Sequence, residues 1–163
     1  LLLATGVSKS SFAGLVIAGF GAGGIIYSFA VGYLVARFSE RKLMLAGGTL
    51  AAIALALVAL NFPWYELIAV FLLLGLGFYS LHGSIQLHVT ELSPTARGAA
   101  MSMHSCTFFF GQAIGPIYYG YAFSHAGTGI PPLIGAGVVL VIGMVCARFL
   151  RHRRHGLTVA DGV

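Results

Sequence analysis

Charged side chains are scarce in this sequence of 163 residues: they make up 8% of it, while hydrophobic residues make up 58%. An ordinary soluble domain carries roughly 25% charged residues. A chain so poor in charge cannot cover itself with polar surface in water. Cysteine is also rare, and Cys106 and Cys146 fall on different predicted spans, which argues against a disulfide and favours two small buried hydrophobic residues. The composition therefore indicates a membrane protein.

Four long stretches contain no charged residue, at 10–36, 43–65, 67–90 and 98–147. A helix that spans a bilayer needs about 20 apolar residues, so the last stretch is long enough for two. The polar, Gly-rich residues 124–129, ahead of Pro131, predict the turn between these two. The sequence therefore predicts an all-α, polytopic membrane bundle of about five transmembrane helices. Their expected bounds are 10–36, 43–61, 66–89, 98–123 and 130–149.

The stretch Gly19-Phe20-Gly21-Ala22-Gly23-Gly24 matches the dinucleotide-binding pattern GxGxxG. That pattern works at a turn between a strand and the water-facing start of a helix, where backbone N–H groups meet a phosphate. Here it lies inside the first charge-free stretch. A nucleotide-binding oxidoreductase is therefore a remote alternative, and we expect neither an enzyme nor a cofactor. The four-residue step from Gly19 to Gly23 instead predicts close helix packing.

The basic residues are distributed unevenly. Threading five helices through a membrane places eight of the nine Lys and Arg residues on one side and Lys9 on the other. By the positive-inside rule, the first residues are external and the tail at 150–163 is cytoplasmic, in the plasma (inner) membrane. This distribution explains the net charge of +5 by the topology in the membrane. The expected partner is therefore the lipid bilayer, and no nucleic acid is expected. The eight are Arg37, Arg41, Lys42, Arg97, Arg148, Arg151, Arg153 and Arg154.

Polar side chains concentrate on the third and fourth predicted helices, whereas the second and fifth are almost entirely apolar and can face lipid. Polar groups at membrane depth face a bundle interior or a water-filled cavity. Steps of three and four residues place them on one stripe of each helix. We interpret the stripes as a pathway for a small amphipathic organic molecule, with interhelical hydrogen bonding as the structural alternative. The pathway candidates are Tyr79, His82, Gln86, His104, Phe108 and Gln112.

His82 is placed near the middle of the membrane, where an imidazole can carry a proton or can be a satisfied neutral group. No pair of histidines has the spacing of a helical metal motif such as HExxH, and the charge-free stretches contain no carboxylate, so we expect no metal site. The fourth helix also contains Gly111, Gly115 and Pro116. Proline can kink a helix and glycine allows close packing beside it, so this segment is a candidate for movement or for a static kink.

Two segments on the basic side carry recognisable motifs. In residues 32–42, Gly32, Arg37 and Arg41 fit the pattern GxLxDRxGRR, whereas Ala36 replaces its acidic residue. This segment resembles the loop that joins paired helices in the major facilitator superfamily of secondary transporters. Because the acidic residue is missing, a charged latch that needs it is not expected.

The second segment reads Glu91-Leu92-Ser93-Pro94-Thr95-Ala96-Arg97-Gly98. It is similar to the loop between the tenth and eleventh helices of that family, and the similarity continues through residues 75–82 and 110–116. Together these stretches resemble bacterial drug and sugar efflux permeases of the proton-antiporter type. The loop residues that carry the similarity are Glu91, Pro94, Arg97 and Gly98.

The resemblance covers essentially the whole chain and implies helices eight to twelve of a twelve-helix fold. Residues 1–8, which begin without Met, would end helix seven or its external loop, and the N-terminal half would be a missing partner. In that family the eighth, tenth and eleventh helices face the cavity or the other half, and the ninth and twelfth lie outside. The halves would then rock on the surfaces around Gly19, Gly23, Gly111, Gly115 and Pro116.

We therefore expect secondary active transport of a small organic solute by alternating access, with proton-coupled efflux as the leading hypothesis. The resemblance alone implies the protons. Two alternatives remain, namely solute uptake by symport and a small membrane scaffold or partner subunit that is complete at 163 residues.

Overall fold

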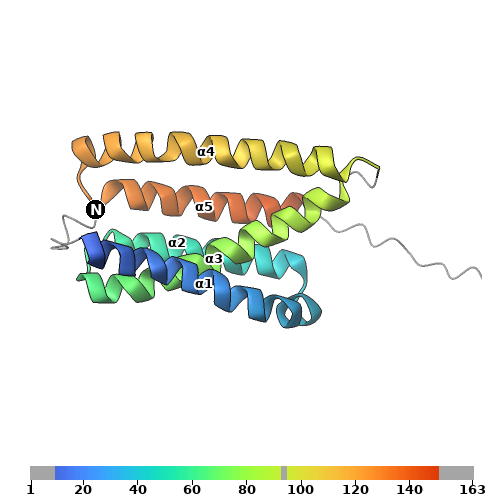
Figure 1. The fold of residues 1–163 in the computed structure, drawn as a ribbon, viewed down its shortest axis with the longest axis horizontal. Helices are drawn as coiled ribbons and strands as arrows, with labels where there is room; N and C mark the ends of the chain where they lie inside the picture. Colours follow the sequence, from blue (N-terminus) through green and yellow to red (C-terminus); the bar gives the residue numbers. More distant parts are fainter. Residues whose placement is uncertain (1–9, 93–94, 151–163) are drawn as a thin grey trace, which may run out of the picture.

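The computed structural model of the chain describes residues 10–92 and 95–150, and these residues form five helices (Figure 1). Each helix begins and ends within three residues of its predicted bounds, and the all-α fold class is confirmed. Residues 1–8 and 151–163, for which the sequence predicts an upstream helix end and a tail, lie outside the described residues. The helices are α1 (Ser10–Arg37), α2 (Glu40–Val58), α3 (Trp64–Glu91), α4 (Arg97–Ala126) and α5 (Ile130–Phe149).

Four helices of the described chain, α1, α2, α3 and α5, are long and apolar enough to cross a membrane. The fifth, α4, has 30 residues and thus sufficient length, but it is not among them. Its polar side chains, including His104, Thr107 and Gln112, lower its mean hydropathy. The number of spans assured by composition is therefore four, and the crossing of α4 stays a prediction.

The helices run lengthwise in alternating directions, and α3 crosses the bundle at a slant (Figure 1). Because short connections join helices of alternating direction, one end of the molecule holds the α1–α2 turn, the α3–α4 loop and the end of α5 (Figure 1). In packing order, α1 lies on α3, α3 on α2, and α2 on α5, while α4 makes much smaller contacts with α3 and α5. The bundle therefore consists of four well-packed helices and one loosely attached helix.

Glycine determines how closely α1 approaches α3. A Cβ atom added to Gly19 would lie 2.5 Å from the carbonyl oxygen of Ile68, and one added to Gly23 would lie 2.8 Å from the backbone nitrogen of Leu76. The close packing predicted for the four-residue step is thus present. Its partner is α3 of the same bundle, because both glycines are buried there, and these two residues are not free for the opposite half.

The helix α2 lies between α3 and α5, and two neighbouring glycines allow it to approach both closely. A Cβ on Gly47 would lie 2.7 Å from the backbone nitrogen of Leu81, and one on Gly48 would lie 2.9 Å from the Cα of Gly143. Successive residues of a helix point in different directions, so the pair serves two neighbours. The expectation that this apolar helix faces lipid therefore holds only for its remaining side, where Ile53 is exposed.

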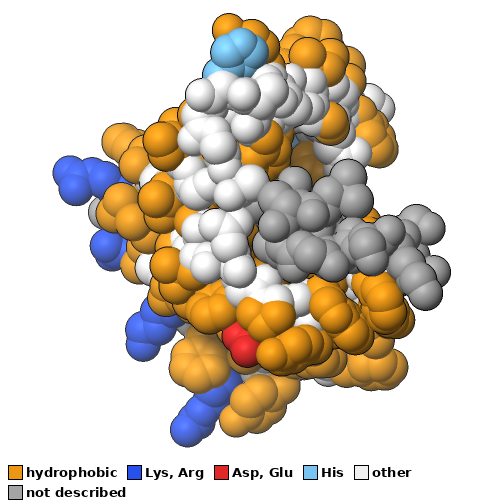
Figure 2. Space-filling view, turned by 90° about the vertical axis from the view of Figure 1, so that its left-hand side faces the viewer, with side chains coloured by type: hydrophobic (Ala, Val, Ile, Leu, Met, Phe, Trp, Pro, Cys, Tyr) orange, Lys and Arg blue, Asp and Glu red, His pale blue; other side chains and the backbone are white. Residues whose placement is uncertain are grey.

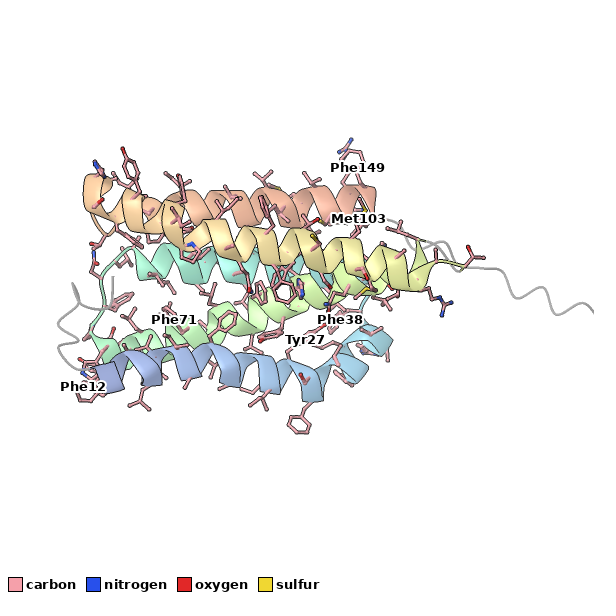
Figure 3. All side chains as sticks on the ribbon, turned by 45° about the horizontal axis from the view of Figure 1, so that its top comes forward. Phe12, Tyr27, Phe38, Phe71, Met103 and Phe149 are labelled. Atoms are coloured by element: carbon pink, nitrogen blue, oxygen red, sulfur yellow. The ribbon has the colours of Figure 1, made fainter. Side chains whose placement is uncertain are left out.

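Hydrophobic side chains cover the flanks of the bundle, as the view onto the end of the molecule shows (Figure 2). No residue of α4 is buried, and Met103, Phe110 and Ile117 on this helix are each about two thirds or more exposed. Phe149 points away from the bundle, whereas Tyr27 is buried with its hydroxyl beside Gly83 of α3 (Figure 3). Such an apolar exterior suits lipid or further helices.

Candidate functional site

The contact between α3 and α4 is built from two aromatic rings and two imidazoles. Phe78 and His82 lie one turn apart on α3, and their rings stack with centroids 5.3 Å apart and planes 10° apart. The ring of His82 lies 5.4 Å from that of His104 and 4.6 Å from that of Phe108, both on α4. We call these four residues the ring cluster. The structure thus brings together three of the predicted pathway residues.

Tyr79, the neighbour of Phe78, belongs to the other side of α3. Its ring centroid lies 5.6 Å from that of Phe20 on α1, and a Cβ on Gly24 would lie 2.5 Å from the tyrosine ring. Phe20 also lies 5.5 Å from Phe78. The glycine therefore makes room for the tyrosine, and an aromatic row runs from α1 through α3 to the ring cluster.

The two glutamines of the predicted pathway are not in this row. Gln86 is half-buried, one turn beyond His82, and Gln112 is exposed, one turn beyond Phe108. Neither amide makes a hydrogen bond within the part of the chain that the structure describes. They extend the two stripes along their helices, and any contact with a solute stays a prediction.

Within the ring cluster the three residues His82, His104 and Phe108 are half-buried. Nε2 of His104 is itself buried and has no hydrogen-bond partner among the described residues. A buried polar atom without a partner costs free energy. A further polar group that hydrogen-bonds this nitrogen would therefore stabilise the α3/α4 contact.

Two residues of the aromatic row, Phe20 and Phe78, were not among the predicted site residues. Phe78 precedes His82 by four residues, so the helical step that linked His82 to Gln86 also marks Phe78. Phe20 lies inside the GxGxxG match, between Gly19 and Gly21. Its position on α1 confirms that the match is a helix segment and not a phosphate-binding turn.

The Gly-Pro segment of α4 lies on an open surface. A Cβ added to Gly111 or Gly115 would meet no atom within 4 Å, and Pro116 is exposed inside the continuous helix. Farther along, Tyr119 packs its hydroxyl against Gly135 of α5. The surface that the sequence assigns to packing between halves is therefore uncovered at these three positions, and its partner stays a prediction.

All Lys and Arg residues of the described ranges lie at the end that holds the α1–α2 turn, the α3–α4 loop and the end of α5. Seen from the opposite end, Lys and Arg appear only at one edge of the outline (Figure 2). Of the loop-motif residues, Pro94 lies outside the described residues. The others are exposed, namely Gly32, Arg37, Arg41, Glu91, Arg97 and Gly98. The uneven charge predicted from the sequence is thus present in the fold.

The same end contains a contact that sequence reasoning missed. Nδ1 of His88, near the end of α3, lies 3.2 Å from Oε2 of Glu40 at the start of α2, and both side chains are largely buried. Glu40 stands where the pattern GxLxDRxGRR has the first of its two closing arginines. The contact joins the start of α2 to the end of α3.

Comparison with known proteins gives a family match over nearly the whole chain: the model of the Major Facilitator Superfamily matches residues 2–161. A facilitated glucose transporter of solute carrier family 2, member 1, from Gallus gallus is 38% identical over 110 residues, which cover 64% of this chain and 22% of that protein. A probable sugar efflux transporter from Helicobacter pylori is 28% identical over 132 residues, which cover 80% of this chain and 33% of that protein. No solved structure gives a significant match.

The chain thus spans a third or less of the length of these relatives. The expectation that it is not an enzyme agrees with the family match, and the helices agree with a multi-pass membrane protein. The chain belongs to the Major Facilitator Superfamily.

Proposed function

We propose that this chain forms helices eight to twelve of a secondary transporter that moves a small organic solute, most specifically a sugar, by alternating access. The observation that carries the proposal is the ring cluster, which presents aromatic faces and imidazoles at the α3/α4 contact. Aromatic faces pack on the C–H face of a sugar ring, and neutral polar groups exchange hydrogen bonds with its hydroxyls. The two relatives, a facilitated glucose transporter and a probable sugar efflux transporter, support this class of solute.

The orientation follows from charge. The end with the basic residues is cytoplasmic by the positive-inside rule, so the α2–α3 and α4–α5 turns are external, in the plasma (inner) membrane. The missing N-terminal half supplies the opposite wall of the cavity. The uncovered surface around Gly111, Gly115 and Pro116 packs against it, and small residues there keep alternative packings close in energy.

Proton-coupled efflux is the transport mode that we propose, with His82 as the residue that takes up the proton. It is half-buried in the ring cluster, and residues 67–90 of its helix contain no carboxylate. Uptake is the second candidate, because one relative is a facilitated glucose transporter.

The test uses the full-length transporter in vesicles with an imposed pH gradient and labelled glucose, in both vesicle orientations. We expect His82→Ala to lower transport and to abolish its dependence on the gradient, while His125→Ala, at the exposed end of α4, keeps both. The experiment distinguishes a role of His82 in proton coupling from a role of the ring cluster in the solute pathway. Transport that loses rate but keeps its pH dependence would remove His82 from coupling, and unchanged transport of every sugar tried would remove the ring cluster from the pathway.

A further inference from the structure

The two imidazoles of the ring cluster come from different helices and lie next to each other at the α3/α4 contact. Their ring centroids are 5.4 Å apart and their planes are tilted by 32°. Nε2 of His104 is buried and lacks a hydrogen-bond partner among the described residues. The ring of His82 is held between Phe78 and Phe108, so its position is determined by packing and not by a hydrogen bond to His104.

From this geometry we infer that His82 and His104 bind one divalent transition-metal ion of the Zn²⁺, Cu²⁺ or Ni²⁺ class between α3 and α4. Neutral imidazole nitrogens are preferred ligands of these ions. Zinc–nitrogen bonds of about 2.0–2.1 Å and a tetrahedral angle place the two ring centroids roughly 5.2 Å apart. The separation in the structure, 5.4 Å, is close to this value.

The site has two protein ligands and open positions. No group of three or more His, Cys, Asp or Glu side chains that could hold a metal occurs in the described ranges, so water or a hydroxyl of a solute completes the coordination. Helical spacing along the sequence could not show such a pair, because the two histidines lie 22 positions apart on separate helices. A bound ion would tie α4, which has no buried residue, to α3.

The inference goes beyond the proposed function, since binding of the ion requires neither sugar nor protons. The test measures Cu²⁺ binding to the full-length protein, purified without a polyhistidine tag, with His152 and His155 changed to Gln in every variant. Electron paramagnetic resonance reports how many nitrogens bind the copper. We expect two imidazole nitrogens in this background and in the matched control His125→Gln.

His82→Gln and His104→Gln should each remove one nitrogen and weaken binding at least about tenfold. A second measurement covers variants that fold poorly: the shift of the thermal midpoint on adding Zn²⁺ is measured for each variant against its own metal-free value. We expect a rise in the background and in His125→Gln, and none in the two cluster variants. Copper or zinc binding that is unaffected by both cluster substitutions, or no binding at all, would overturn the site.

Discussion

The close approach of α1 to α3 makes a prediction that two substitutions on the same helix can test. Gly23→Ala adds a Cβ that would lie 2.8 Å from the backbone nitrogen of Leu76 and 3.1 Å from the backbone carbon of Gly75, with the carbonyl oxygen of Leu72 nearer still. Gly21→Ala, two residues earlier, adds the same atom where nothing lies within 4 Å. Backbone atoms cannot rotate away as a side chain can, so only Gly23→Ala forces the helices apart.

The magnitude follows from the difference between the two variants. Replacing glycine by alanine in a helix gains about 1 kcal/mol of helix propensity, and this gain cancels because both variants have it. What remains is overpacking, which costs about 1–3 kcal/mol. We expect the upper part of this range, about 2–3 kcal/mol, because several backbone atoms block the new methyl group.

The assay is equilibrium unfolding of the full-length protein by SDS in mixed micelles, followed by circular dichroism. Gly14→Ala is a second control, since a Cβ there also meets no atom within 4 Å. Free energies of unfolding that agree within about 0.5 kcal/mol for all three variants would refute the packing described for α1 and α3.

Three further predictions concern the site, the bundle and its orientation. Phe108→Ala removes the ring that lies 4.6 Å from His82 and is proposed to pack on the sugar. Since ring contacts contribute about 0.5–1.5 kcal/mol, the half-saturating sugar concentration should rise about 2- to 12-fold in transport assays. Ser80→Ala removes a hydrogen bond of 3.3 Å from its hydroxyl to a carbonyl oxygen of α2, and SDS unfolding should show a loss of only about 0.6 kcal/mol; a loss above about 2 kcal/mol would contradict this. In a cysteine-free background, Ser39→Cys should react with a membrane-impermeant maleimide only from the cytoplasmic side and Thr128→Cys only from outside, and the reverse pattern would contradict the orientation.

The helices could be predicted from the sequence because the bilayer imposes their length. Charge-free stretches of sufficient length leave little choice, and the bounds agree within three residues. The neighbours of each helix could not be predicted in this way, since hydropathy measures how apolar a helix is and not what it touches. The adjacent glycines Gly47 and Gly48 indicate two close neighbours of α2, because each faces a different helix. Only the fold shows that these neighbours are α3 and α5.

The ring cluster could be predicted in part. The spacing placed His82 and Phe108 on the polar stripes of their helices, and the structure brings them together. Tyr79 satisfies the same spacing, yet its ring packs on α1, because a step of three residues turns a side chain far enough to reach another neighbour. Contacts between helices, such as Glu40 with His88, depend on the axial shift between neighbours, which the turns set and which no single helix reveals.

The distribution of glycine over these contacts separates the rigid part of the bundle from the part that can move. The contacts of α1 with α3, of α3 with α2 and of α2 with α5 each bring backbone within reach of a missing Cβ, so sliding one helix past the other would drive side chains into backbone. The contact of α4 with α3 consists of rings 4.6–6.3 Å apart, whose dispersion attraction has little directional preference. Such rings can exchange partners at small cost. We therefore expect motion within this half to concentrate at α4, which places the residues proposed to contact the solute at a helix contact that can change.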